Sequence, residues 1–306
     1  MTKFRVWIGL GILIIIGVVI ASTGGDPEVD TPISQTETML VDPDPIKFLI
    51  ESLPHAIDES VTPPQWQQYA MATSLAPTQS AIAIVIDDMG NSTDRLDHVL
   101  TLDVPLSLSF LSYVSGLADM IERARTQGHE ILVHLPMEPL DGDIDAGMNV
   151  LTSQMTSSEL QQKIDWHLDQ IEGYVGFNNH MGSKFTANPA GMALVVAAAR
   201  DRGLIYLDSR TTEKTVGSDL ARAAGVPTLQ RDVFLDNQIN DEAILAQLVK
   251  AEEIAHTKGS AIVIGHPYPE TINMLHKWLA SVDDIQIVPL SALVIRNQRK
   301  TKMAQD

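Results

Sequence analysis

From Ala81 onward, short apolar runs alternate with longer stretches in which apolar residues recur three and four positions apart. The apolar runs predict strands at Ile82–Ile86, Leu106–Leu111, Glu130–Leu135, Tyr174–Asn178, Leu204–Leu207, Thr228–Gln230 or Val233–Leu235, Ala261–Gly265 and Ile285–Val288. Helices are expected at Thr93–Leu102, Gly116–Gln127, Ser157–Ile171, Pro189–Arg202, Asp241–Lys258 and Thr271–Ser281. Seven or eight β-α units in about 215 residues predict an α/β fold, a distorted or incomplete (β/α)7-8 barrel. The alternative is a doubly wound open sheet.

The first of these strands, in the segment AIAIVIDDMG, ends in two adjacent acids and a glycine. Asp87 and Asp88 therefore lie where a buried strand leaves the sheet, the edge at which α/β folds bind ligands and metals. Two carboxylates there repel each other and lose solvation, a cost that a shared cation or a reacting proton explains. The plainer interpretation is an acidic turn in which Gly90 supplies a positive φ.

Polar residues also follow the other predicted strands. If the strands are parallel, these side chains converge on one face, where barrel active sites lie. They are His134 and Glu138, then Asn178, Asn179 and His180, then Asp208, Ser209 and Arg210, then Asp236, and finally His266.

Three of these segments suggest particular chemistry. His134 and Glu138, four residues apart, are able to place an imidazole and a carboxylate near one ion. The amides of the segment FNNHMGS suit sugar hydroxyls or an amide substrate, since they both donate and accept hydrogen bonds. Prolines on either side of Tyr268 fix the loop that carries His266.

The remaining candidates are weaker. Asp208 with Arg210, and Arg231 with Asp236, are interpreted as structural ion pairs at the barrel mouth or as substrate contacts. His129 lies an odd number of residues from His134 and is expected on the other face of the sheet. Surface or packing roles are expected for His55, His98, His167, His256 and His276.

Composition excludes several classes of function. The net charge of −18 argues against nucleic acid as a partner. The chain contains no cysteine, which excludes disulfides, thiolate metal sites and a lipid-modified cysteine anchor. It also lacks a glycine-rich phosphate loop, a G-x-S-x-G elbow and an H-E-x-x-H helix.

The amino terminus predicts export. Lys3 and Arg5 precede the uncharged run Val6–Ala21, whose length lies between a long signal-peptide core and a short membrane span. Residues 1–25 are therefore either a signal peptide or an anchor in the inner membrane, with the anchor favoured. Both alternatives place the rest of the chain in a bacterial periplasm or at the cell surface.

The segment between this run and the first strand is acidic and rich in proline. Residues 26–80 carry nine acids against Lys47 alone, and are expected to be a linker. A short helix over Pro45–Ile57 is expected to pack on the body, because its apolar residues have helical spacing. The body is assigned to residues 81–295, and residues 296–306 to a basic, frayed tail.

Residues 81–294 resemble the divergent polysaccharide deacetylase family, a branch of the carbohydrate esterases that remove acetyl groups from sugars. IDDMG resembles the first motif of that superfamily, which implies a general base at Asp87 and a metal ligand at Asp88. GHEILVHLPME resembles the second motif, whose first metal-binding histidine matches His134. IVIGHP resembles the last motif, which implies a general acid at His266, and DSRT and RDVFLD are typical of the divergent branch.

The chain departs from the superfamily pattern at two places. Glu138 stands where a second metal-binding histidine is expected, so the third ligand is either Glu138 or His180, with His180 preferred. The segment GFNNHMGS replaces an Arg-Pro-Pro motif that would orient the base.

The resemblance implies a metal-dependent hydrolase, with Zn²⁺ the expected ion, that removes acetyl groups from an envelope glycan. Asn179, Asp208, Arg210 and Asp236 are then candidates for substrate contact. The alternative is an inactive glycan-binding or scaffolding protein of the cell envelope, which the two departures favour.

Overall fold

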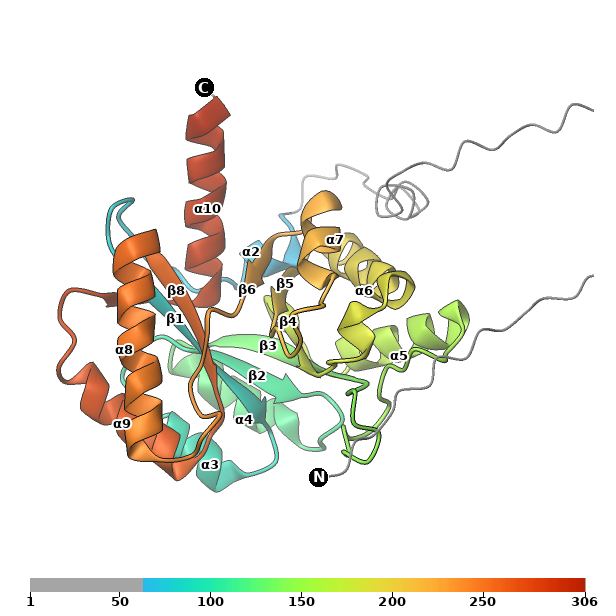
Figure 1. Cartoon of the computed structure of the whole chain (residues 1–306), viewed down its shortest axis with the longest axis horizontal. Helices are drawn as coiled ribbons and strands as arrows, with labels where there is room; N and C mark the ends of the chain where they lie inside the picture. The colour runs from blue at the N-terminus through green and yellow to red at the C-terminus, as the bar shows by residue number, and fades with distance from the viewer. Residues whose placement is uncertain (1–62, 306) are drawn as a thin grey trace, which may run out of the picture. The chain divides into compact units, whose positions relative to one another are not determined.

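The structure, a computed structural model, describes residues 63–305 (Figure 1). Nine strands form one sheet: β1 Ala81–Met89, β2 Ser107–Leu111, β3 Glu130–Met137, β4 Gly176–Met181, β5 Ile205–Asp208, β6 Thr228–Gln230, β7 Val233–Phe234, β8 Ser260–Gly265 and β9 Gln286–Ile287. The helices are α2 Gln65–Tyr69, α3 Thr93–Val99, α4 Leu117–Thr126, α5 Ser157–Leu168, α6 Pro189–Asp201, α7 Gly217–Ala223, α8 Asp241–Lys258, α9 Pro269–Leu279 and α10 Leu290–Gln305, with a 3₁₀ turn at Phe185–Ala187.

The sheet is parallel throughout and curls into an incompletely closed barrel. Its order is β6-β5-β4-β3-β2-β1-β8-β7, with β9 paired to the start of β1. The outermost strands, β6 and β7, follow each other in the chain with only Arg231 and Asp232 between them. So short a connection spans about 10 Å, which forces the two edges of the sheet to approach each other. Both alternatives predicted for the sixth strand therefore form, and the doubly wound open sheet is excluded.

Alternation along β1 builds two cores. Ile82, Ile84 and Ile86 pack with the surrounding helices, while Ala81, Ala83 and Val85 face the interior of the curled sheet. The interior core also contains Leu132 of β3, Leu207 of β5 and Ile264 of β8. Side chains two positions apart in a strand face the same way, and two positions beyond Val85, Leu132, Leu207 and Ile264 stand Asp87, His134, Ser209 and His266. The inner face of the sheet therefore carries polar residues at the carboxyl ends of the strands.

Local capping starts the helices that join the strands. Thr156 and Glu159 form a capping box at α5, and the Asn188 side chain accepts from two backbone N–H groups before Pro189 opens α6. The Asn240 side chain accepts from the third N–H of α8.

The two ends of the described chain differ from the sequence expectation. Arg296 lies inside α10, so the expected frayed tail is a helix whose first turns pack in the interior core through Leu290 and Leu293. Within the expected linker, Trp66 of α2 is buried in the same core. The helix expected over residues 45–57 and the anchor or signal segment at residues 1–25 lie outside the described residues. Among residues 63–305, no helix is both long enough and apolar enough to cross a membrane.

Two buried histidines make stability depend on pH. His129 and His167 are buried, and burial lowers the pKa of each to about 4. Between pH 6.5 and 4 the unfolded chain binds protons at both residues and the folded chain does not, so the free energy of unfolding falls as the pH falls. We expect a loss of roughly 1–3 kcal/mol per histidine across that window.

Thermal unfolding of His129→Asn checks this expectation. In this variant the amide oxygen keeps an acceptor for the Leu106 N–H. Its dependence on pH should be weaker than that of wild type and of the exposed control His256→Asn. Equal slopes in all three proteins would contradict the prediction.

Candidate functional site

The end of β1 is bent by a β-bulge that sets the two acids in place. Ile86 pairs with Leu108 and Met89 with Phe110, so β1 gains one residue on β2 between these pairs. Asp88 occupies the left-handed region with φ +57°, which aspartate tolerates better than most residues. Gly90 follows with φ +112°, where an added Cβ would lie 2.7 Å from Leu117. Gly90 therefore forms the turn that the plainer interpretation expects. The two acids lie beside this turn, and the turn alone does not account for them.

Asp88, His134 and His180 converge from β1, β3 and β4; β3 and β4 are paired, and β2 lies between β1 and β3. Asp88 Oδ1 lies 3.2 Å from His134 Nε2 and 2.9 Å from His180 Nδ1. The two imidazole nitrogens are 3.2 Å apart. The pKa of Asp88 is lowered far below its usual range, because the two imidazoles outweigh the opposing effect of burial.

This donor set fits a divalent metal. Asp88 Oδ1 is buried and forms no hydrogen bond of normal geometry, although two nitrogens lie within 3.2 Å. All three ligand atoms lie within 4.8 Å of one another, which leaves room for one ion between them. Two imidazoles and one carboxylate are a set that Zn²⁺ and related ions accept with positions left open for water or substrate.

Asn178 fixes the orientation of His134. Its Oδ1 accepts from His134 Nδ1 at 2.8 Å and from the Ser109 hydroxyl. An amide oxygen only accepts hydrogen bonds, so the proton of a neutral His134 lies on Nδ1 and the lone pair of Nε2 faces the cluster.

The same amide holds Asp87. Asn178 Nδ2 donates to both carboxylate oxygens, at 2.9 and 3.1 Å. Asp87 is buried, and this burial raises its pKa against the opposing effects of His134 and His266. A carboxylate with a raised pKa accepts protons more readily than an ordinary surface aspartate.

His266 is held by Asp236 across the same end of the barrel. Its Nδ1 lies 2.9 Å from Asp236 Oδ1, and its backbone N–H donates to Oδ2. The Thr271 hydroxyl donates to the same Oδ2. The free nitrogen, Nε2, lies 3.7 Å from Asp88 Oδ2. Burial lowers the pKa of His266, but Asp236 and then Asp87 and Asp88 outweigh it and raise the pKa to about 9.

These groups line one cavity of about 420 Å³. Arg231 crosses one wall, with its guanidinium 5.0 Å from the Phe234 ring centre, and donates to the carbonyls of Ser209 and Arg210. Arg210, exposed at the rim, has φ +48°. Neither expected ion pair, Arg210 with Asp208 or Arg231 with Asp236, is present among the described residues. Asp208 accepts from the Arg210 N–H and from two hydroxyls, Asp236 holds His266, and Arg231 donates to backbone carbonyls.

Glu138 lies outside this cluster. Its carboxylate accepts from Lys184 Nζ at 2.7 Å and from the Ser153 N–H at 2.8 Å. β3 runs to Met137, so Glu138 leaves the strand toward the loop beyond it. The structure therefore places His180 of β4 in the cluster with Asp88 and His134, and Glu138, the alternative ligand, outside it.

Two candidates for substrate contact have structural partners instead. The Asn179 amide is buried and joins the Ser209 N–H to the Met181 carbonyl. Asp208 is fully buried and accepts from the Arg210 N–H and from the Thr215 and Ser218 hydroxyls. Both side chains therefore fix the loops around the cavity, and Asn179 also lies in its lining.

Sequence reasoning missed the central role of Asn178 and of Ser109. The only available signal was position: Asn178 ends a predicted strand beside the polar cluster, and Ser109 is a polar residue inside the predicted strand Leu106–Leu111.

The fold and the site together define an α/β-barrel protein with a candidate metal centre at the end of the barrel where active sites lie. The family model described as divergent polysaccharide deacetylase matches residues 84–294, and the chain belongs to this family.

The chain is also similar to proteins of three bacteria. An uncharacterised protein of Escherichia coli, YibQ, is 35% identical over 232 residues, which cover 76% of this chain and 72% of that protein. An uncharacterised protein of Haemophilus influenzae is 32% identical over 231 residues, covering 73% of this chain and 80% of its own length. The crystal structure of the uncharacterised protein ATU2773 from Agrobacterium tumefaciens is 28% identical with a TM-score of 0.71, and covers 75% of this chain and 95% of its own.

Proposed function

We propose that this protein is a metal-dependent hydrolase that removes acetyl groups from an envelope glycan. The observation that carries the proposal is the convergence of Asp88, His134 and His180 with a buried acid, Asp87, and a charged imidazole, His266, in one cavity. Membership of a deacetylase family supports the substrate class.

Asp88, His134 and His180 would hold the ion, which we expect to be Zn²⁺. A bound divalent ion supplies Lewis-acid polarisation of the acetyl carbonyl. Asp87 accepts the proton of the attacking water, and Asn178 keeps the carboxylate directed into the cavity. His266 donates the proton of Nε2 to the leaving nitrogen or oxygen as the bond to the acetyl carbon breaks. Asp236 keeps that imidazole oriented and charged.

The alternative, a glycan-binding protein without turnover, drew on two departures from the superfamily pattern. His180 supplies a third ligand where Glu138 does not, and Asn178 positions the base where the Arg-Pro-Pro segment is missing. Both points favour the hydrolase.

The test measures acetate released from N- and O-acetylated glycans by the full chain loaded with Zn²⁺. Turnover should disappear with a chelator and return with added metal. A metal-loaded protein that binds glycan and releases no acetate from either substrate would contradict the proposal.

Export to the periplasm or cell surface, with an anchor through residues 1–25, is part of this proposal. A fusion of that segment to a periplasmic reporter tests it.

Replacing Asp236 with asparagine should change the pH profile of the hydrolase. The general acid must be protonated, so activity falls as the pH rises through the pKa of His266. Asp236 contributes most to raising that pKa to about 9. In Asp236→Asn the basic limb of kcat/KM should therefore move toward pH 6.5. Asp94→Asn, an exposed acid on α3, serves as the control. An unchanged basic limb in Asp236→Asn would show that His266 is not the group that titrates there.

A further inference from the structure

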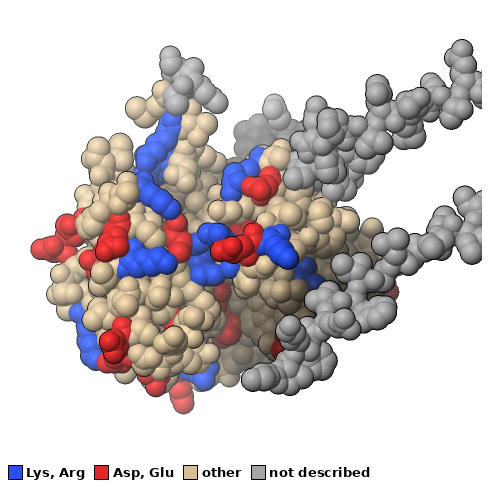
Figure 2. All heavy atoms as spheres, in the orientation of Figure 1, with Lys and Arg blue, Asp and Glu red and all other residues tan. Residues whose placement is uncertain are grey.

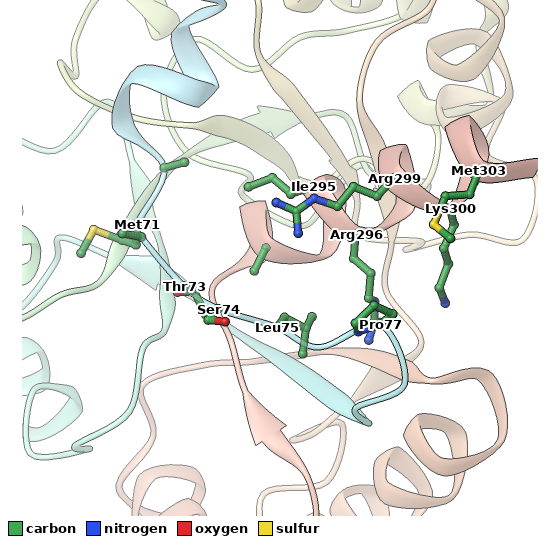
Figure 3. A pocket seen from close by; sticks show the side chains of 13 residues that line it. Met71, Thr73, Ser74, Leu75, Pro77, Ile295, Arg296, Arg299, Lys300 and Met303 are labelled. Carbon is green, nitrogen blue, oxygen red and sulfur yellow. The ribbon is translucent and has the colours of Figure 1, made fainter. Parts of the chain in front are cut away.

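A second hollow lies between α10 and the segment that crosses from α2 to β1. Figure 3 shows it lined by Met71, Leu75 and Pro77 on one side and, on the other, by residues of α10 that include Arg296 and Arg299. Its volume is about 680 Å³, larger than the cavity at the candidate metal centre. The Met71 N–H donates to Glu130, the first residue of β3, and α10 follows β9. The hollow therefore lies at the amino ends of the strands, opposite the candidate active site.

The charge of this hollow is uniformly positive. Arg296, Arg299 and Lys300 line it, and none of the described residues that line it is acidic. The whole chain has a net charge of −18, so this group of cations has the opposite sign to the chain as a whole. Figure 2 shows the projecting part of α10 with basic side chains, and residues 296–305 contain no Asp or Glu.

Arg296 is the unusual member of the set. It is only 5% exposed, and none of the described residues gives its buried Nε and Nη2 atoms a hydrogen-bond partner. Within residues 63–305, the guanidinium makes one hydrogen bond, from Nη1 to the Gln79 carbonyl at 3.0 Å. A buried cation without a counter-ion is costly, and a bound anion would relieve that cost. Arg299 and Lys300 are exposed and are able to contact such an anion directly.

The rest of the lining is mainly apolar, with Thr73 and Ser74 as its uncharged polar members. Leu75, Pro77 and Ile295 form part of the wall, and Met303, which is 76% exposed, extends it along α10. A third hollow continues this surface around the helix between Trp66, Ile295 and Lys302. A small inorganic anion would leave these apolar groups uncovered, whereas hydrocarbon would cover them.

We infer that this hollow binds an anionic amphiphile, a molecule with a phosphate-type headgroup and an attached hydrocarbon chain. The headgroup pairs with Arg299 and Lys300 beside the buried charge of Arg296. The hydrocarbon covers Leu75, Ile295 and Met303. This binding is independent of the hydrolase chemistry at the other end of the barrel.

The test is calorimetric titration of the full chain, kept in a nonionic detergent, with three probes: hexyl phosphate, inorganic phosphate and hexanol. We expect hexyl phosphate to bind at least tenfold more tightly than either of the others. Arg299→Glu combined with Lys300→Glu should weaken that binding at least tenfold. Lys250→Glu, an exposed lysine on α8, makes the same kind of charge change away from the hollow and should leave binding unchanged.

Three outcomes would overturn the inference. Inorganic phosphate binding as tightly as hexyl phosphate would show a plain phosphate site. Equal weakening per charge in Lys250→Glu would show an effect of net charge alone. No saturable binding of hexyl phosphate would exclude the site. The altered residues are exposed, so thermal unfolding should match wild type. Arg299→Gln with Lys300→Gln, which adds no negative charge, provides a second variant with the same expected direction.

Discussion

Asp87→Asn is expected to reduce acetate release by roughly 10²–10⁴-fold, the usual contribution of a general base. The amide has the shape of the carboxylate, and its oxygen still accepts from Asn178 Nδ2. An amide does not accept a proton at neutral pH, so the attacking water keeps its proton. The measurement is kcat/KM for acetate release by the Zn²⁺-loaded protein.

The matched measurement on this variant is its metal content. Asp87 is 3.7 Å from His134 Nε2, on the edge of the ligand cluster, and Asp88 is the carboxylate at its centre. Asp87→Asn should therefore retain about one ion per chain by elemental analysis, with Asp94→Asn as the unaffected reference. Near-normal turnover with full metal content would exclude Asp87 as the base. Loss of the metal instead would make Asp87 a ligand.

The sequence predicted the fold because local rules determine most of it. Buried parallel strands are short and continuously apolar, and their polar ends must lie on one edge whatever the order of strands. Asp87, His134 and His266 could therefore be grouped before any strand order was known. The basic composition from Arg296 onward predicts a frayed tail rather than α10, whose apolar first turns pack inside the barrel.

Local sequence rules do not predict which residues come into contact when they lie far apart in the chain. The choice between Glu138 and His180 depends on where β3 ends and how β4 is aligned with it, and alignment has no local signature. His180 pairs in register with Pro136, which brings its imidazole beside His134. The hub formed by Asn178 likewise depends on β1, β2 and β5 meeting at one amide, which joins Asp87, Ser109 and Ser209.

Removing one ligand of the candidate metal centre should have the largest effect on metal binding. Asp88→Asn and His180→Ala are each expected to weaken Zn²⁺ binding by at least roughly a hundredfold, since even changes beside a ligand cost 10–100-fold. Asparagine tolerates the left-handed backbone at position 88, so the first variant keeps the bulge of β1. His180 is partly exposed at the end of β4, so its truncation leaves no buried cavity.

The decisive comparison is with Glu138→Ala, which removes the residue that stands in the position of the expected histidine. Its carboxylate is paired with Lys184 and the Ser153 N–H, so we expect this variant to bind Zn²⁺ as wild type does. Competition with a chromogenic chelator gives the three affinities on one scale. Weak binding by Glu138→Ala with normal binding by His180→Ala would reverse the assignment. Equal affinity in all variants would mean that Asp88 and His180 do not hold the ion. Weakened binding in Asp88→Asn and His180→Ala with wild-type binding in Glu138→Ala is the expected result, and it would assign two ligands to β1 and β4, beside His134 of β3.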